Sequence, residues 1–514
     1  MNKIITTILL LVSLVGFSQQ KYFSYEEVEF STDLEKRTIA KLLSGEAEPI
    51  DGFLIISSGD SSQFESWKGV YSKEIEKLKD HKKSKKLSKE VKYVYDNIHD
   101  TFLTKYENLA YFDQVFETGV YNCVTAVALY GMAFEAFDIP YHIKETPRHV
   151  YIVADPDDSQ LLIETTDPIS GFKTFTPGFK EQFVARLAMM KLTNQNDIAS
   201  KGIYGVFDEF YFGGAELSLN ALIGIQYYNK GVSLFNEKDY HGAWKALKIA
   251  QLFHSNDQID NMLFASIVNI VSFSDYSDWD DIQLLPYLER FLEFDIKETN
   301  VVGEFQRMIN YVLIQNNNAE KAQKAYDYFM DNSKNEELKK EATYTYYHER
   351  SVLSYNRGNY RQAFDQVSKA YIAKPGNANA ENLLMESFRM SFANKSSEEA
   401  LAKLDTLLTH IPELAKNNRI NTTHLNLYLS VMHDKFDTKR ATEGNTYKKL
   451  FEEIIAANPD YIYDRNILGN AYSKAAVYYF KRGYTSKARG IIQTGLKYAP
   501  GNYQLKTRLR MISR

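Results

Sequence analysis

Two patterns of hydrophobic and polar positions divide the chain near residue 220. Before that point, apolar residues at helical spacing, clearest over residues 73–103, are followed by short β-rich runs. These runs are 141–144, 149–153 and 161–166. Because short turns separate the runs, we expect three antiparallel strands that pack against the helix following Cys123.

A different pattern recurs from residue 220 onward. A small residue is followed at +4 and +7 by apolar or small residues, and at +12 by a residue that stops a helix. The clear copies begin at Ala243, Ala363, Ala400 and Ala488, and weaker ones begin at Ala322 and Tyr447. A similar turn precedes three of the copies, at 237–240, 357–360 and 481–484.

This spacing predicts stacked pairs of antiparallel helices, because small residues at successive turns let neighbouring helices approach closely. It resembles the tetratricopeptide repeat, whose period is about 34 residues. The steps between copies vary, which indicates degenerate repeats or insertions. A helical bundle without repeats is the alternative, but the joint recurrence of turn and helix stop favours repeats.

The chain contains one cysteine, Cys123, which excludes an intramolecular disulfide and any site built from several cysteines. Gly119 and Asn122 precede it as turn or cap residues, and an apolar run follows. These residues predict that Cys123 lies at or just before the first turn of a buried helix. The unpaired N–H groups at a helix start stabilise a thiolate, the form of cysteine that acts as a nucleophile.

His149 and Asp167 complete a predicted catalytic triad with Cys123. In the expected meander, His149 begins one strand and Asp167 ends its neighbour, so the two residues lie side by side. His149 would take the proton of Cys123 or pair with its thiolate, and Asp167 would hold the imidazole tautomer. The backbone N–H of Cys123 and one further donor would bind an oxyanion. The candidates for that donor are Tyr111, Gln114 and Tyr121.

Each of these residues also has an ordinary structural alternative. A lone cysteine is often a small buried hydrophobe, and an aspartate before proline is often a turn residue. The three residue types in matching positions nevertheless favour a triad. A metal site of His142, Glu145 and His149 is disfavoured because Pro147 interrupts the segment between the histidines. We therefore expect no metal.

The order of Cys123 at a helix start, His149 opening a strand and Asp167 before a proline resembles the transglutaminase-like superfamily. With trailing tetratricopeptide repeats, the chain is similar to the SirB-type branch. The resemblance implies an α+β, papain-like domain followed by an all-α tetratricopeptide-repeat solenoid. It also implies hydrolysis or acyl transfer at amide bonds through a thioester on Cys123. Val150 and Tyr151 depart from the tryptophan-containing or aromatic-rich stretch that often follows the histidine.

We predict four segments. They are a signal peptide (1–18), a helical or extended lead-in (19–89), the transglutaminase-like domain (90–215) and the repeat array (220–514). The signal peptide is predicted from Lys3, the apolar run that follows it and the small residues before the predicted cleavage site. The alternative is that the segment is not cleaved and anchors the protein in the membrane. No later segment has the length and apolarity of a membrane span. We expect an exported protein, periplasmic or secreted.

Composition and motifs narrow the possible partners. The chain has 61 basic and 66 acidic residues, a net charge of −5, which gives no electrostatic reason for a nucleic-acid partner. A lysine-rich stretch at 77–89 is expected to be a solvated helix face or linker, with an anionic surface as the alternative binding partner. The chain lacks P-loop, serine-hydrolase, dinucleotide and zincin motifs, so no cofactor is expected.

The predicted function is a cysteine hydrolase or acyltransferase that acts on amide bonds, with helical repeats that bind a protein or peptide. The alternative is a catalytically inert tetratricopeptide-repeat scaffold.

Overall fold

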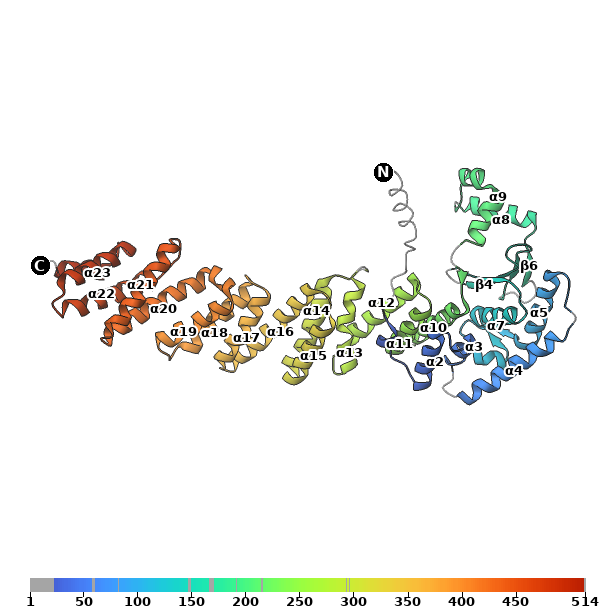
Figure 1. The fold of residues 1–514 in the computed structure, drawn as a ribbon, viewed down its shortest axis with the longest axis horizontal. Coiled ribbons are helices and arrows are strands. Elements are labelled where there is room, and N and C mark those ends of the chain that lie inside the picture. The colour runs from blue at the N-terminus through green and yellow to red at the C-terminus, as the bar shows by residue number, and fades with distance from the viewer. Residues whose placement is uncertain are drawn as a thin grey trace, which may run out of the picture. The chain divides into compact units, whose positions relative to one another are not determined.

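The computed structural model describes residues 23–57, 61–81, 83–146, 149–165, 171–190, 192–213, 216–292, 294 and 296–512 (Figure 1). The predicted signal peptide and Asp167 lie outside these residues. Contacts divide the chain into two compact units, Met1–Ser274 and Asp275–Arg514. None of the helices in the described ranges is long and apolar enough to cross a membrane.

The first unit contains eleven described α-helices. They are α2 (Asp33–Ser44), α3 (Pro49–Leu54), α4 (Ser61–Lys79), α5 (Leu87–Phe102), α6 (Phe112–Glu117), α7 (Cys123–Ala136), α8 (Pro177–Met189), α9 (Gln195–Tyr211), α10 (Leu219–Asn236), α11 (Tyr240–Phe253) and α12 (Asp257–Phe273). The apolar run after Cys123 becomes α7, and its side chains are buried almost throughout, from Val124 to Phe134. This confirms the helix predicted to follow the cysteine.

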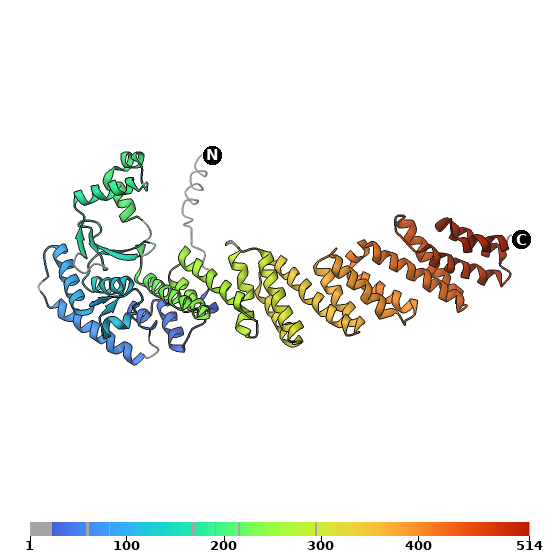
Figure 2. The ribbon, with the colours of Figure 1, turned by 180° about the vertical axis from the view of Figure 1, so that it is seen from behind.

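A five-stranded antiparallel sheet lies beside α7, with strand order β6-β5-β4-β3-β7. The strands are β3 (Tyr141–Thr146), β4 (His149–Ala154), β5 (Leu161–Ile163), β6 (Phe172–Thr174) and β7 (Glu216–Leu217). The sheet positions α7 through contacts with β4 (Figure 2). The predicted meander is therefore confirmed. A second, two-stranded parallel sheet joins β1 (Lys105–Tyr106) to β2 (Val120–Tyr121).

Helices α8 and α9 form a pair on the other side of the sheet from α7 (Figures 1 and 2). Val184, Leu187, Val206 and Phe207 make a small buried core between them. The face of the sheet that carries Tyr151, Val153 and Leu162 packs against the same region. The sheet is thus covered by helices on both faces.

The predicted α+β, papain-like fold class is wrong for this chain. Helices account for 73% of the structure, and the strands are few and short, so the architecture is that of an all-α repeat protein with a small sheet. The error has a physical origin. The β-rich pattern spans only 141–166, whereas the predicted lead-in (19–89) and much of the predicted α+β domain (90–215) form helices, including α2 to α5 and α8 to α9.

The second unit is built of helices. They are α13 (Trp279–Gln283), α14 (Glu298–Ile309), α15 (Ala319–Asn332), α16 (Glu336–Asn356), α17 (Tyr360–Ala373), α18 (Ala378–Phe392), α19 (Ser397–His410), α20 (Asn418–Asp437), α21 (Ala441–Ala457), α22 (Arg465–Phe480), α23 (Thr485–Tyr498) and α24 (Tyr503–Ile512). Shorter 3-10 helices lie at Leu285–Phe291 and Pro412–Lys416, and a π-helical turn lies at Asn310–Gln315.

The recurring spacing corresponds to packed helix pairs in both units. Its small residues are fully buried, as Ala243, Ala363 and Ala488 show. Each predicted turn reverses the chain through one residue in the left-handed conformation: Lys238 (φ 67°), Gly358 (φ 77°) and Gly483 (φ 84°). The helix after each turn ends before the predicted stop residue, for example α17 at Ala373 and α23 at Tyr498. Tetratricopeptide-like helical repeats are therefore present.

Close contact between paired helices explains why small residues occupy these positions. A methyl group added at Gly231 of α10 would lie 2.7 Å from Leu247 of α11. A methyl group added at Gly495 of α23 would lie 3.0 Å from Tyr472 of α22. Contacts this short leave no space for larger side chains without moving a helix.

We predict that Ala400→Leu destabilises the protein, because Ala400 is 5% exposed at the small position of its helix pair. The expected loss in the free energy of unfolding is about 1–3 kcal/mol. The matched control is Ala402→Leu on the same helix, since Ala402 is exposed and its change should stay within about 0.5 kcal/mol. Urea unfolding followed by circular dichroism measures both, and equal effects would contradict the packing argument.

Candidate functional site

Cys123 is held at the first position of α7 by a capping box around Asn122. The Asn122 side chain accepts a hydrogen bond from the Thr125 N–H (2.9 Å), and the Thr125 hydroxyl accepts one from the Asn122 N–H (2.9 Å). The Asn122 amide also donates to the Ala110 carbonyl at 3.0 Å. Cys123 itself is half-buried. The sulfur therefore sits on a fixed helix start that solvent can reach.

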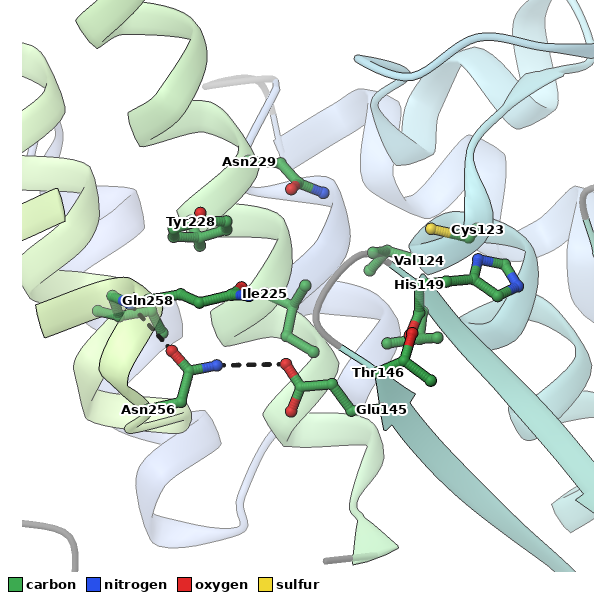
Figure 3. A pocket seen from close by; sticks show the side chains of 12 residues that line it. Cys123, Val124, Glu145, Thr146, His149, Ile225, Tyr228, Asn229, Asn256 and Gln258 are labelled. Carbon is green, nitrogen blue, oxygen red and sulfur yellow. Dashed lines mark hydrogen bonds between the residues drawn. The ribbon is translucent and has the colours of Figure 1, made fainter. Parts of the chain in front are cut away.

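His149 opens β4, as predicted, and its ring lies beside Cys123, which helps to raise the pKa of the ring. Figure 3 shows one ring nitrogen on the side of Cys123. The other side of the ring is fixed by a carboxylate, because His149 Nε2 lies 2.7 Å from Glu164 Oε1. Thiol, imidazole and carboxylate thus lie one after the other, with the imidazole hydrogen-bonded to the carboxylate.

Glu164 occupies the place in this chain that the sequence analysis gave to Asp167, which lies outside the described residues. The register accounts for Glu164. Ile152 pairs with Ile163, and alternate residues of a strand share a face, so Glu164 continues the face of Leu162. His149 continues the same face of β4. Counting the alternation beyond β5 would have identified Glu164 from the sequence.

The electrostatics of His149 depend on both partners. Burial by itself lowers the pKa of His149, but hydrogen bonds and negative charge from Cys123 and Glu164 outweigh it and raise the pKa to about 9. The ring is therefore protonated at neutral pH. A protonated imidazole beside a thiolate is the resting state that cysteine acyl transfer requires.

Tyr106 of β1 is a further neighbour of Cys123, which the sequence analysis did not single out. Burial, followed by the effect of Cys123, raises the pKa of Tyr106 to about 12. Tyr106 therefore stays protonated at physiological pH. No sequence motif pointed to it, because β1 is only two residues long.

A cavity of about 160 Å³ opens beside Cys123 and His149 (Figure 3). Its far walls come from β3, α10 and the start of α12. The lining residues there include Glu145, Tyr228, Asn229, Asn256 and Gln258. Among the described residues of the lining, His149 is the one basic side chain and Glu145 the one acidic side chain, and the amides of Asn229, Asn256 and Gln258 offer hydrogen bonds.

Glu145 joins the sheet to the helices around this cavity. Its carboxylate lies 2.9 Å from His254 Nε2 and accepts a hydrogen bond from the Asn256 amide at 3.2 Å. Asn256 also caps α12 by accepting from the Ile259 N–H. These contacts fix the wall opposite the sulfur.

The three donors proposed from the sequence do not line the cavity. Tyr111 caps α6 together with Gln114, and Tyr121 is buried at 2% exposure beside His99 and Tyr106. Among the described residues, no group of three or more histidine, cysteine or acidic side chains is arranged to hold a metal ion. His142 instead contacts Glu216 at 3.0 Å, away from His149.

Comparison with known proteins adds little at this site. No protein-family model matches the sequence, and no curated protein matches it. Among solved structures, 16 chains match, and one is the crystal structure of the TPR domain of P58(IPK). That match has 13% identity and a TM-score of 0.18, and covers 65% of this chain and 92% of the other. Because the TM-score is this low, the match does not support an assignment. The identification of the repeats is based on the helix pairs of this structure.

The helical repeats point to protein partners, because stacked helix pairs present extended surfaces to other chains. The transglutaminase-like resemblance receives no support from the family and curated comparisons.

We predict that the His149 ring titrates with a midpoint near pH 9, and that Glu164→Gln lowers this midpoint. Since the pKa in the folded protein exceeds the ordinary value of about 6.5, the protonated ring stabilises the fold fully below about pH 6.5. This contribution is lost as the pH rises through about 9. NMR of the histidine rings measures the midpoint, with His149→Ala assigning the signal.

The control is Glu181→Gln, since Glu181 is exposed and not bonded to His149. A wild-type midpoint at or below about 6.5 would contradict the proposed charge pairing.

Proposed function

We propose that this chain transfers or hydrolyses acyl groups through a thioester on Cys123, while its helical repeats bind a protein or peptide. The observation that supports the chemistry is the His149 ring, which lines the same cavity as Cys123 and hydrogen-bonds to the Glu164 carboxylate at 2.7 Å. A cysteine with a purely structural role does not require a histidine and a carboxylate in this order beside it. The arrangement has the nucleophile, base and orienting group of cysteine acyl transfer.

In the first step, the Cys123 thiolate attacks the carbonyl carbon of an amide, and the C=O electron pair moves onto the oxygen. Protonated His149 then gives its proton to the amide nitrogen, and the amine leaves. The product is a thioester with neutral His149. Glu164 stabilises the imidazolium before this transfer and keeps the ring oriented.

In the second step, water or an amine attacks the thioester carbonyl. Neutral His149 accepts the proton of the attacking group, and the sulfur leaves as a thiolate. The result is a carboxylic acid or a new amide, with the thiolate and imidazolium restored. The raised pKa of His149, about 9, favours its return to the protonated form.

Partner binding is supported by cavities among the helices of the second unit. One, of about 520 Å³, is lined by apolar Met385, Phe388 and Ile462 together with Arg389 and Arg419. Ile462 is 65% exposed although it is apolar. Apolar surface flanked by charged residues is typical of a peptide-binding groove.

The alternative is a scaffold without catalysis, and the predominance of helical repeats favours it over an enzyme when the thiol site is set aside. The two functions differ in one respect: a scaffold has no need of Cys123 reactivity. Cys123→Ala would leave partner binding intact under both, but would abolish acyl chemistry only if the site is catalytic.

We predict that His149→Ala slows acetylation of Cys123 by p-nitrophenyl acetate at pH 7 by about 100-fold or more, because the variant loses the charge partner of the thiolate. Cys123→Ala should abolish the burst of p-nitrophenolate. Since Cys123 is the only cysteine, mass spectrometry assigns the label without ambiguity. His410→Ala, at an exposed histidine of α19, is the control. Acetylation at the wild-type rate in His149→Ala would overturn the catalytic proposal.

A further inference from the structure

Helix α10 is the first helix of the first repeat-type pair, and it forms the wall of the cavity that faces Cys123. Ile225, Tyr228 and Asn229 lie at positions i, i+3 and i+4, so they share one face of the helix, and all three line the cavity. The repeat region therefore contributes side chains to the same cavity as the nucleophile.

The rotation of α10 about its axis is fixed by hydrogen bonds on either side of Asn229. Gln226 donates to the Ala110 carbonyl (2.8 Å), Tyr227 donates to Glu35 (2.9 Å), and Lys230 donates to the Ile56 carbonyl (2.9 Å). Gln226 and Tyr227 are buried. With these side chains held, Asn229 has little freedom to turn away from the cavity.

The Asn229 side chain extends from α10 toward Cys123 across the cavity (Figure 3). Within the described ranges, no group is hydrogen-bonded to its amide. A carboxamide offers two N–H donors. Val124 and Ile225 line the same space, and apolar walls strengthen a hydrogen bond made there.

We propose that Asn229 donates a hydrogen bond to the carbonyl oxygen of the acyl group that Cys123 attacks, an assignment that rests on the proposed function. When the thiolate adds to the carbonyl carbon, the C=O electron pair moves onto this oxygen. The Asn229 amide and the backbone N–H of Cys123 then stabilise the oxyanion until the leaving group departs. The donor thus comes from the repeat region, about 100 residues after the cysteine.

The same wall indicates the class of acyl group. Glu145 places a carboxylate in the cavity, already engaged by His254 and Asn256. An anionic acyl group would meet this charge, whereas an uncharged peptide or carboxamide group would meet Asn229, Asn256 and Gln258. The cavity therefore disfavours an anionic acyl group and offers hydrogen bonds to a neutral one. Tyr106 does not compete for this role, because it is not among the residues that line the cavity.

The test compares two probes of Cys123 in the full-length chain. p-Nitrophenyl acetate reacts through an oxyanion, whereas methyl methanethiosulfonate reacts with the thiolate and has no carbonyl. We expect Asn229→Ala to slow acetylation by about 100-fold. Its reaction with methyl methanethiosulfonate should stay within about twofold of wild type. Asn229→Asp, which keeps the shape but replaces the donor with a charge, should be slower still in acetylation.

Asn236→Ala, at an exposed asparagine near the end of α10, is the matched control. Wild-type acetylation in Asn229→Ala, or equal slowing of both probes, would overturn the assignment of Asn229. If His149→Ala also leaves acetylation unchanged, the proposed function fails as well. If His149→Ala slows both probes while Asn229→Ala slows neither, only the assignment of Asn229 fails.

Discussion

One carbonyl group connects the two halves of the candidate site. The Ala110 oxygen accepts hydrogen bonds from the Asn122 amide at 3.0 Å and from the Gln226 amide at 2.8 Å. Asn122 caps the helix that begins with Cys123, and Gln226 lies three residues before Asn229 on α10. All three groups are buried, where an unmade hydrogen bond is costly. Cys123 and the opposite wall of the cavity are therefore both positioned by hydrogen bonds to the Ala110 carbonyl group.

The charges of the site follow from this arrangement. Cys123 can approach His149 only because the capped helix start points its sulfur at the end of β4, where Glu164 holds the other ring nitrogen. Each contact favours the protonated ring, and together they outweigh the effect of burial on its pKa. The fold thus raises the pKa of His149 through contacts that an unfolded chain would not keep.

The sequence predicted local features well and long-range ones poorly. Gly119, Asn122 and the apolar run were sufficient to place Cys123 at a helix start, and the turn residues defined the helix pairs. Glu164 was overlooked although the predicted run 161–166 contains it, because the partner of His149 was sought at the end of the run rather than by the alternation of faces along it. Asn229 carries no local signal at all, since its role depends on a tertiary contact of α10. The fold class failed for the related reason that a short β-rich stretch was extended to its helical neighbours.

The single half-exposed cysteine also has a consequence for redox chemistry. Under the proposed function Cys123 reacts as an accessible thiolate, and such thiolates are readily oxidised to a sulfenic acid. Redox-sensing proteins often use a second cysteine to capture the sulfenic acid as a disulfide, and this sequence contains no second cysteine. Reduction of oxidised Cys123 would depend on a thiol from another molecule. Further oxidation to the sulfinic acid would inactivate the site irreversibly.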